Sequence, residues 1–361
     1  MKTLLFIFFL MSSQAVFGQS ENNVKLEEQI TSADRMAFVN PDSALTTLKK
    51  LEPKIDGGRL KSKFLLAKGS AYSVKHLSSD ALKCGFESLN NSQKGKDSLM
   101  MINALGFIGN QYYILKLNKK AINYLNKAET IIDYLNDDSL QQVTANIYFV
   151  KALIYKDNLD SEFAIRYFDK AINEYKKSKD KSTLLNVNIT KMQKGYSLID
   201  IGRADEAESI YLEVVKETEF HKISELYPYA KIGLAAVYES KKQFEKANKI
   251  LLEAEKQIRN TSNIGMLTEV YDALSQNYLG QNDKEKYFYY SQKLENHLLQ
   301  NDEIEKKSFS DLLNKNIESR DLELENNQRL FGIFIILIFL IVLGSLFYIK
   351  KRINQLKSVN N

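Results

Sequence analysis

The chain has 361 residues, of which 26% are charged, with only three prolines, one cysteine and no tryptophan. Its formal net charge of +5 comes entirely from its two ends, because the long segment between them contains 45 basic and 45 acidic residues. A neutral body of this kind lacks the basic surface through which proteins bind nucleic acid. The single cysteine excludes an internal disulfide.

Residues 1–18 predict a secretory signal peptide. One basic residue, Lys2, precedes an apolar core from Leu4 to Met11, and the small or β-branched residues Val16 and Gly18 precede a cleavage position. No cysteine stands at that position, which argues against a lipid-anchored export route. We therefore expect the segment that follows to be exported.

Residues 25–300 have few turn formers and long helical periodicities, which predict α-helices almost throughout. In GNQYYILKLNKKAINYLNKA a small residue is followed three positions later by a large one and nine positions after that by an alanine. The four best copies of this spacing are Gly109-Tyr112-Ala121, Ala152-Tyr155-Ala164, Gly195-Leu198-Ala207 and Ala235-Tyr238-Ala247. Weaker copies are Gly69-Tyr72-Ala81, Ser275-Tyr278-Tyr287 and a partial one at Ala44.

The last residue of each copy, here called the marker, recurs in steps of 37 to 43 residues. The markers are Ala44, Ala81, Ala121, Ala164, Ala207, Ala247 and Tyr287. The pattern resembles the tetratricopeptide repeat, whose standard step is about 34 residues and whose helix A packs small and large residues against an alanine on helix B. The resemblance implies an all-α solenoid of about seven helical hairpins over residues 25–300, a right-handed superhelix with a concave face.

The three prolines agree with this division into helices. Asn40-Pro41 is typical of a helix N-cap followed by a first turn, and Pro53 lies where the helix begun at Pro41 should stop. Pro228 is expected to open the first helix of the sixth hairpin.

Residues 301–329 contain strong helix formers and neither proline nor glycine. Apolar Ile317, Leu324 and Phe331 recur every seven positions. The alternate heptad positions are occupied by Arg320 and by Gln328 or Asn327, which disfavours a stable coiled coil. We therefore expect a single continuous juxtamembrane helix that leads into the next segment.

Residues 330–349 form an uncharged apolar run of 20 residues, the length that crosses a bilayer as one helix. Four basic residues follow it in the tail, residues 350–361. Positive charge next to a span marks the cytoplasmic side. The sequence thus predicts a single-pass protein of the bacterial cytoplasmic (inner) membrane, with a periplasmic body and a cytoplasmic tail.

Few residues point to chemistry. His76, His221 and His297 are isolated in sequence from other metal-binding residues, and neither a glycine-rich phosphate loop nor a nucleophile elbow is present. Cys84 falls inside a second helix, where we expect a small buried side chain; the alternative is an intermolecular disulfide. We expect no enzyme activity, no cofactor and no metal site.

The resemblance implies a partner-binding surface on the concave face. It is lined by positions of the first helices on the side opposite the residues that pack within the hairpin. These positions are Asn103, Asn110, Tyr113, Asn146, Lys156, Tyr196 and Tyr229. Amides and tyrosines suit hydrogen bonding to a peptide or protein partner. The alternative interpretation is that the tyrosines are half-buried packing residues and the asparagines reflect composition. The repeated Lys-Asn pattern that clamps a chaperone's C-terminal carboxylate does not occur.

The complete layout resembles the exported sensor half of Bacteroidetes-type tetratricopeptide membrane receptors, in which a basic coiled-coil linker and an effector domain follow the span. Here KKRINQLKSVNN is similar to the first turns of such a linker, without an effector domain after it. We expect a membrane-anchored scaffold that binds a protein or peptide. The alternatives are a signalling receptor whose output module was lost or is a separate cytoplasmic effector, and an enzyme of unrecognised type.

Overall fold

The computed structural model describes residues 21–135, 137–178, 183–221, 223, 226–258 and 264–299. The expected signal peptide, juxtamembrane helix, membrane span and tail lie outside these residues. None of the helices within the described ranges is long and apolar enough to cross a bilayer. The chain divides into two compact units, Met1–Lys293 and Leu294–Asn361, and the hairpins described below belong to the first, except for the end of the last helix, residues 294–299.

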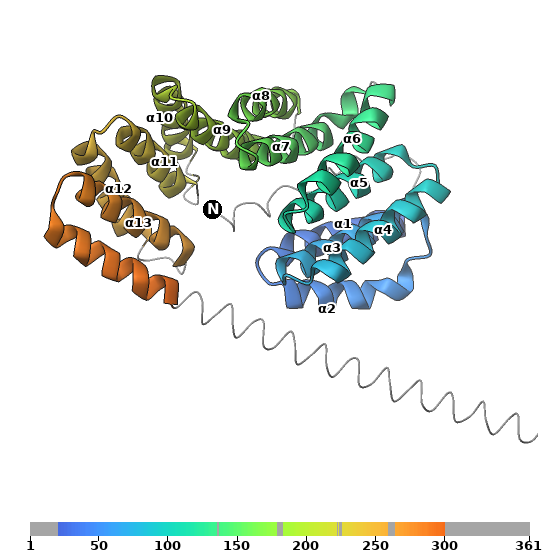
Figure 1. The fold of residues 1–361 in the computed structure, drawn as a ribbon. Helices are drawn as coiled ribbons and strands as arrows, with labels where there is room; N and C mark the ends of the chain where they lie inside the picture. The colour runs from blue at the N-terminus through green and yellow to red at the C-terminus, as the bar shows by residue number, and fades with distance from the viewer. Residues whose placement is uncertain are drawn as a thin grey trace, which may run out of the picture. The chain divides into compact units, whose positions relative to one another are not determined.

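The helices follow one another as hairpins, each with a first and a second helix, and the described ranges contain no strand (Figure 1). The pairs are α1 (Glu21–Ala37) with α2 (Pro41–Leu51), α3 (Gly58–Val74) with α4 (Ser78–Lys94), α5 (Ser98–Ile114) with α6 (Asn118–Leu135), α7 (Gln141–Asp157) with α8 (Ser161–Lys177), α9 (Thr183–Asp200) with α10 (Ala204–Phe220), α11 (Tyr227–Ser240) with α12 (Phe244–Ile258), and α13 (Ile264–Gly280) with a helix that begins at residue 284. Repeated helical hairpins confirm the expected all-α class.

The marker residues lie near the start of every second helix. All six marker alanines are fully buried, where the absence of a larger side chain lets the first helix approach closely. Each also donates its backbone N–H to the carbonyl of the residue four positions before it, as Ala121 does to Leu117 at 3.0 Å. Tyr287 makes the same bond to Asp283 at 3.0 Å. The marker therefore lies in the first turn of its helix, and its small side chain sets the distance to the neighbouring helix in six of the seven hairpins.

The turn within most hairpins is closed in one recurring way. One residue adopts φ near +60°, as at Lys116 (60°) and Leu159 (61°), and Gly202 takes this place in the fifth hairpin with φ 78°. The next N–H then donates to the carbonyl of the large residue of the repeat, as Leu117 does to Tyr112 at 2.9 Å. This is the bonding of a Schellman motif, which satisfies the carbonyls at the end of a helix.

The first helices form a continuous layer. Each contacts the first helix of the next hairpin, from α1 and α3 through to α11 and α13. From α2 to α12 each second helix contacts both the first helix of its own hairpin and the first helix of the next one. Side chains on successive first helices therefore become neighbours although they are about 40 residues apart in sequence.

Tyr211 shows how a second helix fills the space between two first helices. This fully buried side chain of α10 lies against Gly195 on α9 and Gly233 on α11. A Cβ atom added at Gly233 would lie 2.1 Å from the tyrosine ring. The phenol donates a hydrogen bond to the carbonyl oxygen of Met192 at 2.7 Å. Glycine at both contacts is thus a packing requirement.

The predictions for the prolines and the cysteine are confirmed. Asn40 is the N-cap of α2 and its side chain accepts a hydrogen bond from the Ser43 N–H, while α2 ends at Leu51, two residues before Pro53. Pro228 lies in the first turn of α11. Cys84 is buried in α4, and burial raises the pKa of its thiol to about 11.

Candidate functional site

All seven residues predicted to line a partner-binding surface lie on first helices. Asn103, Asn110 and Tyr113 are on α5, Asn146 and Lys156 on α7, Tyr196 on α9 and Tyr229 on α11. We call the surface formed by these seven residues the first-helix surface. Since α5, α7, α9 and α11 contact one another in this order, the seven residues belong to adjacent elements.

Tyr113 and the three asparagines of the first-helix surface are buried, so four of its seven residues offer a partner little exposed area. The Asn103 amide donates to the carbonyl of Leu99 in its own helix at 2.9 Å. The Asn146 oxygen accepts a hydrogen bond from the hydroxyl of Tyr175, on α8, at 2.5 Å. Lys156, Tyr196 and Tyr229 are half-buried and so retain surface that a partner can reach.

Tyr113 connects two hairpins through a carboxylate. Its hydroxyl donates to Asp157 Oδ2 at 3.0 Å, and Lys116 Nζ donates to the same oxygen at 3.0 Å. Burial raises the pKa of the Tyr113 phenol, and the negative charge of Asp157 raises it further. The phenol therefore remains a protonated donor over the physiological pH range.

Lys156 lies against the next hairpin and contacts neutral groups there. Its Nζ donates to Gln193 Oε1 at 2.9 Å and lies 5.1 Å from the centroid of the Tyr196 ring, both on α9. Burial lowers the pKa of this lysine, while the carboxylates of Asp200, Asp157 and Glu269 act in the opposite direction. Tyr196 in turn packs edge-on against the buried ring of Tyr211.

Three deeply buried lysines of the first helices have carboxylate partners. Lys63 pairs with Glu27, Lys151 with Glu129, and Lys191 with Glu213 at 3.0 Å. Buried charges need such pairing because their removal from water costs several kcal/mol per ion. Lys156 differs from these three lysines, since none of the ion pairs found in the described ranges includes it.

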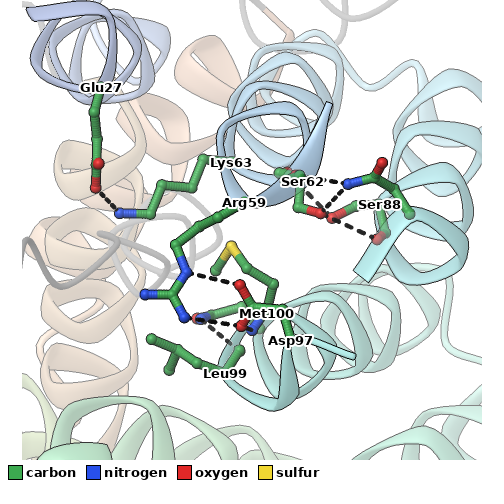
Figure 2. A network of polar contacts seen from close by, with 11 residues as sticks. Glu27, Arg59, Ser62, Lys63, Ser88, Asp97, Leu99 and Met100 are labelled. Carbon is green, nitrogen blue, oxygen red and sulfur yellow. Dashed lines mark hydrogen bonds and ion pairs between the residues drawn. The ribbon is translucent and has the colours of Figure 1, made fainter. Parts of the chain in front are cut away.

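Figure 2 shows a network near the N-terminus in which charges are satisfied internally. Lys63 and Arg59 both project from α3, Lys63 toward Glu27 on α1 and Arg59 toward Asp97 at the start of α5. Arg59 donates to both oxygens of Asp97, at 2.7 and 3.1 Å, and Asp97 also caps α5 through the Met100 N–H. Burial disfavours the Asp97 carboxylate, but these hydrogen bonds hold its pKa below the usual value. This network holds helices together.

Acidic residues lie on the first helices toward the C-terminal side. Burial raises the pKa of Glu239, on α11, and the negative charge of Asp272, on α13, raises it further. Glu269, also on α13, acts electrostatically on both Tyr196 and Lys156. Glu239, Glu269 and Asp272 thus place negative charge on α11 and α13.

Gln193, Asp157 and Glu239 are not among the seven residues predicted from the sequence. A signal for Glu239 was present, because Tyr113, Lys156, Ile199 and Glu239 follow one another at the steps of the markers, 43, 43 and 40 residues. These positions are therefore equivalent in successive first helices. Gln193 had no such signal, since its contact with Lys156 joins different positions of two hairpins.

No family model and no curated protein matches this sequence. Several solved structures are similar to the structure of this chain. The apo form of RapI is 10% identical over 78% of this chain and 99% of that chain, with a TM-score of 0.59. A Rap protein complexed with Competence and Sporulation Factor is 13% identical over 79% and 89%, with a TM-score of 0.54. A STAND protein with a tetratricopeptide repeat sensor from Pyrococcus horikoshii is 19% identical over 76% of this chain and 41% of that chain, with a TM-score of 0.63.

The chain has a tetratricopeptide-repeat fold. This confirms the resemblance drawn from the marker spacing. At these low identities the likeness shows the fold alone. The function of this tetratricopeptide-repeat chain must therefore be inferred from the contacts of its own side chains.

Proposed function

We propose that this tetratricopeptide-repeat chain is a scaffold that binds a peptide or protein partner on its first-helix surface. The observation that carries the proposal is the continuous layer of first helices, on which Lys156, Tyr196 and Tyr229 remain half-buried. Such side chains combine apolar area with polar groups, which suits them to recognition of a polypeptide. The similar Rap structure complexed with Competence and Sporulation Factor supports the proposal.

The proposed location is the outer face of a bacterial cytoplasmic membrane. Support comes from the sequence alone, namely the signal-peptide pattern of residues 1–18, the apolar run 330–349 and the basic tail 350–361. In this arrangement the membrane helix concentrates the scaffold, and the partner bound to it, at one surface. We propose no enzymatic activity, cofactor or metal for the chain.

A second candidate function is the sensing half of a transmembrane receptor whose effector is another chain. The basic segment KKRINQLKSVNN favours it, because this segment is similar to the beginning of the linkers in such receptors. In this version, binding at the first-helix surface changes the position of the membrane helix, and a cytoplasmic protein reads the change.

Crosslinking in the native bacterium, followed by mass spectrometry, tests the scaffold. The full-length chain is compared with a Tyr196→Ala/Tyr229→Ala variant and with Tyr134→Ala, a matched control on α6 whose side chain is 88% exposed. We expect the control and the wild type to capture the same exported partner and the double variant to lose it. Equal capture by all three forms would contradict binding at the first-helix surface.

A form lacking Lys350–Asn361 separates the two candidate functions. If a cytoplasmic regulator is captured only by the complete chain, the tail makes a signalling contact and the receptor is correct. If both forms capture the same exported partner and nothing cytoplasmic, the membrane segment is an anchor.

A further inference from the structure

The ammonium group of Lys156 retains hydrogen-bonding capacity in a half-buried position. An ammonium carries three N–H donors. One is directed to Gln193 Oε1 at 2.9 Å, and the Tyr196 ring covers another side of the nitrogen at 5.1 Å. Both contacts are neutral, so an anion that reaches the nitrogen meets a cation with a donor still available.

The nearby carboxylates do not form an ion pair with the Lys156 ammonium. Asp157 follows Lys156 in the chain, but its Oδ2 accepts hydrogen bonds from Tyr113 and Lys116. Asp200 and Glu269 act on Lys156 only through space, and burial still lowers the pKa of the lysine against their combined effect. A partly desolvated cation without a close anion is costly, whereas an incoming anion forms a charge-assisted hydrogen bond there.

The first helix that carries Lys156 is linked to both neighbouring first helices. The carboxylate of Asp157 links α7 to α5, and Gln193 with Tyr196 links α7 to α9. Tyr196 is itself supported by Tyr211, which is held between two glycines. The position of the ammonium is therefore fixed before a ligand arrives, which reduces the entropy cost of binding.

We propose that Lys156, oriented by Gln193 and Tyr196, binds one carboxylate of a peptide ligand, either an acidic side chain or the free C-terminus. This inference rests on the proposed peptide-binding function and specifies its ligand. A single carboxylate fits better than an acidic run, because Asp157, Asp200 and Glu269 already place negative charge around the site. Glu239 and Asp272, farther along the first helices, likewise disfavour additional negative charge.

The test uses the full-length chain in lipid nanodiscs and a display library of random linear peptides. Peptides selected by the wild type are synthesised with each carboxylate intact or replaced by the corresponding amide, and their affinities are measured by fluorescence anisotropy. We expect one carboxylate in each peptide whose amide form binds about 10-fold to 100-fold more weakly, the range of a hydrogen bond between charged groups. This comparison needs no variant of the protein.

A double-mutant cycle assigns that carboxylate to Lys156. Lys156→Met keeps the unbranched stem against the Tyr196 ring and removes the charge. In this variant we expect the acid and amide forms to bind equally, and in Lys156→Arg the preference for the acid should persist. The matched control is Lys120→Met, an exposed lysine 5.4 Å from the ring of Tyr112, which should leave the preference unchanged.

The outcomes distinguish this inference from the proposed function. Peptides that lose binding in Tyr196→Ala/Tyr229→Ala but bind equally as acids and amides would overturn the carboxylate site and leave the scaffold in place. The same holds if Lys156→Met still prefers the acid. Failure to select any peptide that depends on the first-helix surface would overturn both.

Discussion

At the scale of single residues, this fold depends on positions where only glycine leaves room for a buried neighbouring side chain. Tyr211 packs between Gly195 and Gly233, and a Cβ at Gly233 would lie 2.1 Å from its buried ring. The ring cannot retreat, because Gly195 borders it on the other side. We predict that Gly233→Ala lowers the free energy of unfolding by about 1–3 kcal/mol, the usual cost of overpacking a core.

Chemical denaturation followed by circular dichroism measures this effect. The matched control is Gly95→Ala, because a Cβ there meets its nearest atoms at ordinary contact distances of 3.5 and 3.8 Å. A smaller side chain at Tyr211 should also reduce the cost of Gly233→Ala, since the two residues share one contact. Equal stability of Gly233→Ala and the wild type would show that α10 and α11 have room to separate.

Leu159 carries strain of a different kind. It adopts φ 61° in the turn between α7 and α8, and 93% of its side chain is exposed. A left-handed conformation costs a non-glycine residue roughly 1–2 kcal/mol, while glycine adds about 0.5–1 kcal/mol of unfolded-chain entropy. We predict that Leu159→Gly raises the free energy of unfolding by about 0.5–1 kcal/mol.

The thermal unfolding midpoint provides the measurement for Leu159→Gly. Leu115→Gly is the control, because this half-exposed leucine at the end of α5 has φ −77° and gains nothing from glycine. A lower midpoint for Leu159→Gly than for the wild type would mean that the leucine contributes contacts that its exposure does not indicate.

At the scale of elements, Asp34 links the pH to the docking of α1 on α3. It is 2% exposed, and burial raises the pKa of its carboxyl to about 7, although the hydroxyl of Ser70 and the charge of Arg35 act in the opposite direction. The folded chain thus prefers the protonated form. The stability that this preference gives is complete below the unfolded pKa of 3.8 and is lost as the pH rises through about 7.

We therefore predict that α1 becomes easier to unfold as the pH rises from about 4 to about 7. Hydrogen exchange of the α1 amides, corrected for the intrinsic effect of pH, is the measurement. Asp34→Asn should abolish the dependence, since the amide stays neutral. Ser70→Ala should extend the loss to higher pH, because it removes a hydrogen bond that lowers the pKa. An unchanged slope in Asp34→Asn would assign the effect to another group.

The hairpins could be predicted from sequence because the packing that defines them is local. A small residue, a large residue and a marker such as Ala121 lie within 13 residues of one another and meet inside one hairpin. The left-handed turn positions were less accessible, because glycine and asparagine favour this conformation at Gly202 and Asn282 but Leu159 gives no such signal. Helix propensity does not predict which residue adopts a positive φ after the end of a helix.

The candidate site was predicted less completely, for a physical reason. The register of the repeat placed all seven predicted residues on first helices, but it could not show which atoms face a partner. Asn146 bonds Tyr175, 29 residues away, and Lys156 bonds Gln193, 37 residues away. The first contact joins two helices of one hairpin at positions outside the repeat pattern. The second depends on how successive hairpins stack, which the pattern within a single repeat does not specify.

At the scale of the whole molecule, the scaffold and the receptor make different demands on residues 301–349. A scaffold needs only attachment to the membrane. A receptor needs a stiff connection, because a continuous helix couples movement at one end to movement at the other, whereas a flexible chain does not. The two functions can therefore be separated by changing the mode of attachment.

We predict that partner capture survives when residues 330–361 are removed and the chain is attached through an N-terminal lipidated cysteine. The physical reason is that the first-helix surface consists of residues on α5, α7, α9 and α11 and includes none of residues 330–361. Crosslinking yield of the exported partner is the first readout, and the cellular transcript profile is the second. A companion variant replaces residues 301–329 by a Gly/Ser linker of equal length and keeps the natural span. For a scaffold, both forms should match the wild type in both readouts; normal capture with a lost transcript response in both would instead assign signal transmission to the helix.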